Sequence, residues 1–437
     1  MAVSSRAEPR PSAHTGTAGR YRPSRGLTLG ALLTVSSLLA LGACSSDPSG
    51  PAATTAGTEP EATAPSGSGP AGSRTPPEQF SGSLEEFYEV PDPLVEGDPG
   101  QLIRVQDLGE SDGYRHLRVM YHSRDAQDQD RAVTGIVSYP QNPAPEGGWP
   151  VVATAHGTTG LGTKCAPSRT ASAAPDYGIE GVRVMTDYIG MGPVGEVHSY
   201  LSGLSEGRSV IDSVRAARLL PEASAGDRWV VVGHSQGGHA ALFTHELAEE
   251  YAPELDHLGS VVSAPAAVLD KRFGPDDEVV PRMVALMGLY GIAQDHPELD
   301  PDDYAGDQLR ANDQVVTTGC TQDVIDAFVT IPPDQLYKLN PMDDPGARAV
   351  VMANDPATVA TDVPMLLLYG DLDWWVVPER VKYLFGQLCD GGQKTELVEV
   401  VGADHGNLLA KADQTVTSWL DDRLQGANAT DSCPDAA

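Results

Sequence analysis

Ser235 lies at the centre of a pentapeptide whose residue types could form a catalytic nucleophile. The pentapeptide is Gly-His-Ser-Gln-Gly, a G-x-S-x-G pattern, and it lies between an apolar run at 229–232 and a helix-like run at 239–251. This strand–turn–helix order is typical of serine hydrolases, in which a sharp turn lifts the serine hydroxyl above the sheet. Gly233 and Gly237 are expected to keep that turn free of colliding side chains.

Two backbone N–H groups are expected to face this serine and to stabilise an oxyanion. Gln236 follows the serine at a helix N-terminus, where its N–H has no partner within the helix. The second N–H should come from the loop His-Gly-Thr-Thr-Gly, which follows a strand-like run at 151–155. Thr158 is the candidate there, through its backbone. His156 in this loop and His234 beside the serine are interpreted as orienting or packing residues, not as bases.

A serine is a weak nucleophile and needs a histidine base that is oriented by an acid. In enzymes with this elbow, the acid and then the histidine follow the serine along the chain. Five of the eleven histidines follow Ser235, and three of these, His257, His296 and His405, lie beyond the helix-like run at 239–251. His405 comes just after a strand-like run at 395–401, where a base should lie. His257 is expected at the surface and His296 in a solvated acidic stretch.

The acid should end the strand that precedes the histidine. A buried-strand run at 363–369 leads into Gly-Asp-Leu-Asp, so that Asp371 and Asp373 compete for this role. Asp373 fits the usual G-x-x-D spacing, whereas Asp371 is expected to cap or orient the loop. The predicted triad is therefore Ser235, Asp373 and His405.

The chain also resembles the secretory lipases, the α/β-hydrolase group that includes fungal lipase A-type enzymes and many actinobacterial lipases. The resemblance runs from about Phe87 to Cys433, and the loop after Asp373 carries one residue more than the compact loop of the family. It rests on the elbow and on an ordered set of short segments: DPG at 98–100, IR at 103–104, YHS at 121–123, VTG at 133–135, CAPS at 165–168, TDYIGMG at 186–192 and VRAAR at 214–218.

Four cysteines follow position 44, and an even number in an exported chain indicates disulfides. The count alone leaves three pairings open. The resemblance to secretory lipases implies the pairs Cys165–Cys320 and Cys389–Cys433. No C-x-x-C or Cys/His cluster occurs in the sequence, so no metal site is expected.

The N-terminus is predicted to be a targeting segment. Arginines precede an apolar run at 27–40, which closes with Leu-Gly-Ala-Cys, similar to a bacterial lipobox. The run is shorter than the roughly 20 apolar residues of a membrane span. Residues 1–43 are therefore predicted to be a lipoprotein signal peptide, Cys44 a lipid anchor, and residues 44–79, rich in Ser, Pro, Gly and Thr, a disordered tether. The protein is expected on the extracellular side of a bacterial membrane, either lipid-anchored or secreted.

The chain is strongly acidic, with 61 acidic and 29 basic residues and a formal charge of −32. This charge disfavours binding to nucleic acid and adhesion of the protein itself to anionic lipid.

Strand-like runs alternate with helical patterns over most of the chain, which predicts a parallel sheet with right-handed crossovers after three antiparallel strands. The expected fold is an α/β-hydrolase: a mostly parallel eight-stranded sheet, helices on both faces, a core formed by 80–269 and 362–437, and a helical cap at 270–361. The runs are 102–108, 114–123, 132–139, 149–155, 182–187, 229–233, 258–264, 363–370 and 395–401.

Within the expected cap, the segment 283–292 is apolar nearly all round. It is interpreted either as the core of the cap or as the wall of an acyl-chain tunnel, which flexible methionines would suit. Met283, Met287 and Tyr290 are the candidate substrate-binding residues.

These patterns together predict a monomeric carboxylic ester hydrolase, a lipase or carboxylesterase that acts on a lipid or ester substrate through an acyl-enzyme, without metal or cofactor. One alternative is another acyl hydrolase or an acyltransferase that uses the same triad on a peptide, polyester or cell-envelope lipid. Another is a non-catalytic surface lipoprotein that only binds a ligand.

Overall fold

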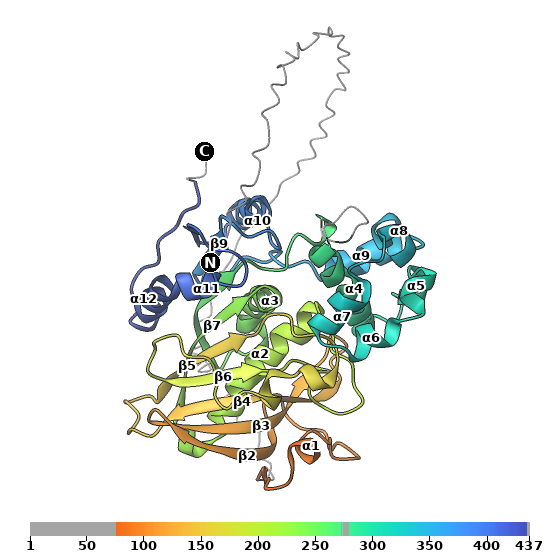
Figure 1. Ribbon diagram of the computed structural model, residues 1–437. Helices are drawn as coiled ribbons and strands as arrows, with labels where there is room; N and C mark the ends of the chain where they lie inside the picture. Colours follow the sequence, from red (N-terminus) through yellow and green to blue (C-terminus); the bar gives the residue numbers. More distant parts are fainter. Residues whose placement is uncertain (1–75, 272, 274–278, 435–437) are drawn as a thin grey trace, which may run out of the picture. The chain divides into compact units, whose positions relative to one another are not determined.

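One mixed sheet organises the computed structural model, which describes residues 76–434 apart from 272 and 274–278 (Figure 1). The spatial order of its ten strands is β1-β2-β3-β4-β6-β5-β7-β8-β9-β10. The strands are β1 (Glu78–Gln79), β2 (Leu102–Ser111), β3 (Tyr114–Arg124), β4 (Asp130–Pro140), β5 (Trp149–Ala155), β6 (Val182–Thr186), β7 (Ala225–His234), β8 (Asp256–Ser263), β9 (Met365–Gly370) and β10 (Thr395–Val400).

The sheet has an antiparallel part, from β2 through β3 and β4 to β6, and a parallel part from β6 to β10. The predicted number of eight strands is too small, because all nine strand-like runs join one sheet and β1 adds a parallel edge to β2. With only two residues, β1 is too short to produce a periodic pattern. The folded part also begins before the predicted start at residue 80.

Helices cover both faces of the parallel strands. In β7, Val231 belongs to a core that includes side chains of α2 and α3, whereas Val230 and Val232 belong to a core that includes side chains of α12. Burial on both faces explains why residues 229–232 of this strand are continuously apolar and do not alternate. The helices outside the segment between β8 and β9 are α1 (Leu84–Phe87), α2 (Gly203–Arg218), α3 (Gln236–Tyr251), α10 (Pro378–Asp390), α11 (Leu408–Lys411) and α12 (Asp413–Leu424).

The segment between β8 and β9 is helical and has a hydrophobic core of its own. Figure 1 shows its helices grouped together, in teal and light blue. They are α4 (Val279–Asp295), α5 (Asp307–Arg310), α6 (Asp313–Thr318), α7 (Thr321–Phe328), α8 (Pro333–Leu336) and α9 (Pro345–Ala353).

The predicted signal peptide, Cys44 and the tether up to residue 75 lie outside the described residues. Across the described part of the chain, no helix combines the length and the apolar character that a membrane crossing requires.

His245, a buried histidine on α3, should make the stability of the fold sensitive to acid. Burial lowers the pKa of His245 to about 4, and the ring lies 3.0 Å from Ser260 Oγ and 2.8 Å from Thr361 Oγ1. In the unfolded chain a histidine titrates near 6.5, so the unfolded state binds more protons between these values and stability falls as the pH falls. We expect His245 to cost roughly 2 kcal/mol of unfolding free energy between pH 7 and about 4.5.

Urea unfolding at these two pH values, on the wild type and on His245→Gln, measures this contribution. Glutamine does not titrate, so the variant should lose less stability than the wild type on acidification. An equal loss in both proteins would contradict the prediction.

Candidate active site

A sharp turn between β7 and α3 carries Ser235. Its backbone has φ 59° and ψ −118°, a conformation that a residue with a side chain rarely adopts and that is common at functional sites. The glycines on either side are required sterically: a Cβ on Gly233 would lie 1.9 Å from the Gly237 carbonyl oxygen, and a Cβ on Gly237 would lie 1.9 Å from that of Ala155. The local sequence therefore determines the shape of this turn.

Backbone hydrogen bonds hold the turn against the end of β8. The Ser235 N–H donates to the Ser263 carbonyl at 2.9 Å, and the Ala266 N–H donates to the Ser235 carbonyl at 3.0 Å. Gln236 is the first residue of α3, so its N–H has no acceptor within the helix.

A carboxylate and an imidazole from two neighbouring loops meet beside this turn. Asp373 Oδ2 lies 2.7 Å from His405 Nδ1, and the Asp373 side chain is fully buried. The other oxygen, Oδ1, accepts hydrogen bonds from the N–H groups of Trp375 and Val376, each at 2.9 Å. One carboxylate thus orients the histidine and shapes its own loop.

Asp371, the competing carboxylate, lies elsewhere. It is exposed, and its Oδ1 accepts a hydrogen bond from the Gly402 N–H in the loop that carries His405. The structure therefore brings Asp373, and not Asp371, to the histidine, while Asp371 joins the two loops.

Ser235 and His405 line one pocket of about 520 Å³. The described residues contain no hydrogen bond between the serine hydroxyl and the imidazole. In unliganded enzymes such contacts are often long and tighten only when substrate binds. The pocket is lined by Gly157, Thr158, His234, Ser235, Trp374, Trp375, Asp404, His405 and Gly406.

Two aromatic rings contact the His405 imidazole. The indole of Trp375 stacks on it, with ring centroids 5.2 Å apart and planes at 19°, and the His234 imidazole lies on it at 4.6 Å and 43°. Burial lowers the pKa of His234 to about 4, and a proton on His405 would lower it further. His234 is therefore neutral near pH 7.

The predicted oxyanion residues have partners that the sequence did not suggest. The Gln236 amide Nε2 lies 2.7 Å from both Glu206 Oε1 and His198 Nε2. Burial lowers the pKa of His198 to about 4, so this ring is neutral and can accept the amide hydrogen while Nδ1 donates to Ile189 O. These two contacts hold the side chain of Gln236, the residue that follows Ser235.

Glu206 also contacts His239 on α3, with 2.7 Å between Oε2 and Nδ1. The other ring nitrogen of His239 lies 2.8 Å from the Asn354 carbonyl oxygen, at the end of α9. Burial disfavours the charged imidazole, but Glu206 and this carbonyl raise the pKa of His239. The charge of Glu206 gives no distinct sequence signal for this cluster, because α2 also carries Arg208, Asp212, Arg215 and Arg218.

The loop after β5 is fastened to the segment between β8 and β9. Thr321 Oγ1 donates to the Thr158 carbonyl at 3.3 Å, and the Thr321 N–H donates to the Thr159 carbonyl at 2.9 Å. Thr158 Oγ1 also lies 2.9 Å from the hydroxyl of Tyr200, which precedes α2. Next to these contacts, Cys165 is bonded to Cys320, while Cys389 is bonded to Cys433. Both disulfides have the pairing that the family resemblance implied.

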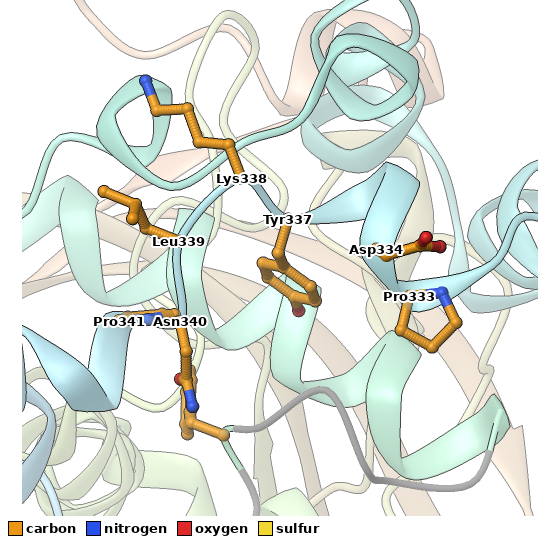
Figure 2. Close-up of a pocket in the computed structure, with 8 residues that line it drawn as sticks. Pro333, Asp334, Tyr337, Lys338, Leu339, Asn340 and Pro341 are labelled. Atoms are coloured by element: carbon orange, nitrogen blue, oxygen red, sulfur yellow. The ribbon is translucent and has the colours of Figure 1, made fainter.

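Met283, Met287 and Tyr290 do not line the pocket of Ser235. Their side chains are buried in the hydrophobic core of the segment between β8 and β9. Another pocket, apolar and of about 340 Å³, lies in the same segment, and none of the triad residues lines it (Figure 2). It is lined by Phe273, Pro333, Asp334, Tyr337, Lys338, Leu339, Asn340 and Pro341.

The described residues contain no group of three or more His, Cys, Asp or Glu side chains that could hold a metal ion.

Comparison with known proteins identifies the sequence group. The model of the family described as "Secretory lipase" matches residues 179–432. Lipase A of Moesziomyces aphidis is 24% identical over 238 residues, which are 49% of this chain and 50% of that protein. Secreted triacylglycerol lipase LIP3 of Malassezia globosa is 24% identical over 301 residues, 62% of this chain and 65% of that protein. The chain thus spans half to two thirds of these curated relatives.

Solved structures share the fold. Candida antarctica lipase A in its closed state has a TM-score of 0.67 at 16% identity, over 79% of this chain and 87% of that one. The rice cell wall degrading esterase LipA from Xanthomonas oryzae has a TM-score of 0.60 at 18% identity, over 76% of this chain and 100% of that one. The predicted α/β-hydrolase fold class is thereby confirmed.

Proposed function

The chain belongs to the secretory lipase family, and from that premise we propose that it is a carboxylic ester hydrolase, a lipase or carboxylesterase. The relatives named above include a secreted triacylglycerol lipase, which supports a lipid or other ester as the substrate. The observation that carries the proposal is the 2.7 Å contact between Asp373 and His405 in the pocket that also contains Ser235 on its strained turn.

In the proposed first half-reaction, Ser235 Oγ attacks the ester carbonyl carbon and His405 Nε2 takes the hydroxyl proton. The carbonyl π electrons move to oxygen and form an oxyanion, which the N–H groups of Gln236 and Thr158 stabilise. When the oxyanion collapses, the bond to the alcohol oxygen breaks, and His405 returns the proton to that oxygen. The products are the free alcohol and an acyl group on Ser235.

Water completes the cycle by the same path in reverse. His405 takes a proton from water, hydroxide attacks the acyl carbon, and the proton goes to Ser235 Oγ as the acid leaves. Asp373 holds the imidazole so that Nδ1 carries its hydrogen toward the carboxylate and Nε2 is free to exchange protons. No step needs a metal ion or an organic cofactor.

The remaining parts of the chain are assigned by the same proposal. The helical segment 270–361 is the cap over a core formed by 80–269 and 362–437, and the apolar side chains Met283, Met287 and Tyr290 are candidates to limit the acyl chain. Cleavage before Cys44, followed by lipidation of its thiol, would hold the enzyme, as a monomer, on the outer side of a bacterial membrane through a tether that begins at Cys44 and ends before β1.

A fluorophosphonate probe and a substrate panel test the proposal. The panel consists of short and long p-nitrophenyl esters, tributyrin, a long-chain triacylglycerol and a peptide. We expect covalent labelling of Ser235 and hydrolysis of esters but not of the peptide. Cleavage of the peptide, or transfer of the acyl group to an added alcohol in preference to water, would assign another acyl chemistry. The absence of both labelling and turnover would indicate a binding protein.

A further inference from the structure

The indole of Trp375 and the imidazole of His234 both contact the His405 ring. The triad mechanism proposed above uses neither contact. An imidazole held by one hydrogen bond to Asp373 can still rotate about that bond, and contact with two further rings restricts this motion. We infer that Trp375 is a positioning residue of the reaction, which with His234 fixes the His405 ring and stabilises the positive charge that the ring gains during acyl transfer. This inference rests on the function proposed above.

The first support is that one carboxylate holds both His405 and the backbone of Trp375. Asp373 Oδ2 contacts His405 Nδ1 at 2.7 Å, and Asp373 Oδ1 accepts a hydrogen bond from the backbone N–H of Trp375 at 2.9 Å. The Asp373 carboxylate that orients the His405 imidazole directly therefore also holds, by a hydrogen bond to the backbone, the turn that carries the Trp375 side chain.

The second support is the geometry and charge of the two contacts. Near-parallel rings 5.2 Å apart place the imidazole over the indole face, where a cation is attracted by the ring quadrupole. When His405 takes the serine proton, it becomes such a cation. The His234 imidazole, the other ring in contact with His405, is neutral near pH 7 and therefore adds ring contact without a repelling charge. Its Nδ1 lies 3.0 Å from Ser263 Oγ, which fixes this ring in turn.

The third support is the difference between the two adjacent tryptophans. Trp374 is half exposed and meets the Trp375 indole edge-on, at 5.7 Å and 72°, whereas Trp375 is partly buried and carries the stack on His405. Both line the pocket, so they share a location but differ in whether they contact the base. This pair offers a matched comparison within one loop.

Steady-state kinetics on p-nitrophenyl acetate test the inference. Trp375→Leu keeps an apolar side chain but removes the ring, and we expect kcat to fall about tenfold, equivalent to about 1.4 kcal/mol, with KM changed by less than about threefold. Trp375→Phe retains a ring face and should recover most of the loss. Trp374→Leu should change KM more than kcat. A rise in KM at unchanged kcat for Trp375→Leu, or no recovery with phenylalanine, would overturn the positioning role.

A double-mutant cycle with His405→Ala separates action through the histidine from a general effect on the fold. If Trp375 acts through His405, adding Trp375→Leu to His405→Ala should change the residual turnover by less than about twofold. A further tenfold loss in that background would show that the indole acts on the fold or on the substrate, and would overturn the inference. If instead Ser235→Ala left wild-type turnover intact, the proposed function itself would fail, which is a distinguishable result.

Discussion

Replacing Ser235 with alanine should abolish nearly all ester hydrolysis, with a loss of about 10⁶-fold in kcat, the size of nucleophile losses in other triad enzymes. The substitution removes the atom that forms the acyl-enzyme and leaves the backbone donors of the oxyanion pocket in place. Alanine can occupy the same strained turn, since the hydrogen bonds that hold Ser235 there are made by its backbone atoms. The measurement is kcat for a p-nitrophenyl ester, together with the midpoint of thermal unfolding.

Ser172→Ala is the matched control for this loss. Ser172 is an exposed serine outside the pocket, so its substitution should leave turnover and the unfolding midpoint unchanged. Retention of more than a tenth of wild-type activity in Ser235→Ala would remove the serine from the mechanism, because no other hydroxyl occupies the elbow.

The parts of the site that the sequence predicted are those specified by short stretches of chain. The elbow needs two glycines around Ser235, because a Cβ at either position would lie 1.9 Å from a carbonyl oxygen, and this explains why the pattern is so restrictive. Asp373 and His405 are predictable because each follows a strand, and because parallel strands end at one edge of the sheet. Spacing and strand order are local signals, so they are visible without a structure.

The parts that could not be predicted depend on contacts between distant segments. Glu206 and His198 contact Gln236 only because α2 packs beside α3. No spacing in the sequence predicts these contacts. The same holds for His257, for which the sequence predicts a surface position but which stacks on Trp229 at 4.5 Å. In such cases a polar residue beside an apolar run is ambiguous, because burial is decided by its tertiary neighbours.

The apolar segment at 283–292 illustrates a further limit. A helix that is hydrophobic all round is buried, but its pattern does not say whether its neighbours are protein side chains or a substrate. In the structure Met283 and Met287 are fully buried within the core of the segment between β8 and β9. Their role in limiting the acyl chain therefore stays a prediction, which depends on whether substrate opens a path through that core.

Asp373→Asn should be the second most damaging substitution, with a loss of about 10⁴-fold in kcat, the order observed when the triad acid of a serine protease is neutralised. An asparagine fills the same volume, and its oxygen can still accept from the N–H groups of Trp375 and Val376. Its amide nitrogen would then face His405 Nδ1 and donate to it. This places the imidazole hydrogen on Nε2, so the base can no longer take the serine proton.

Asp371→Asn is the matched control for this loss, because it makes the same chemical change two residues away. Asp371 is exposed and accepts from the Gly402 N–H, a hydrogen bond that an asparagine oxygen can retain. We expect a loss of less than about threefold, since the exposed carboxylate is screened by solvent and joins two loops without touching the imidazole. Measurement of kcat for both variants at pH 7 distinguishes the roles. The reverse ranking would assign the triad acid to Asp371 and would require the loop to rearrange around His405 when substrate binds.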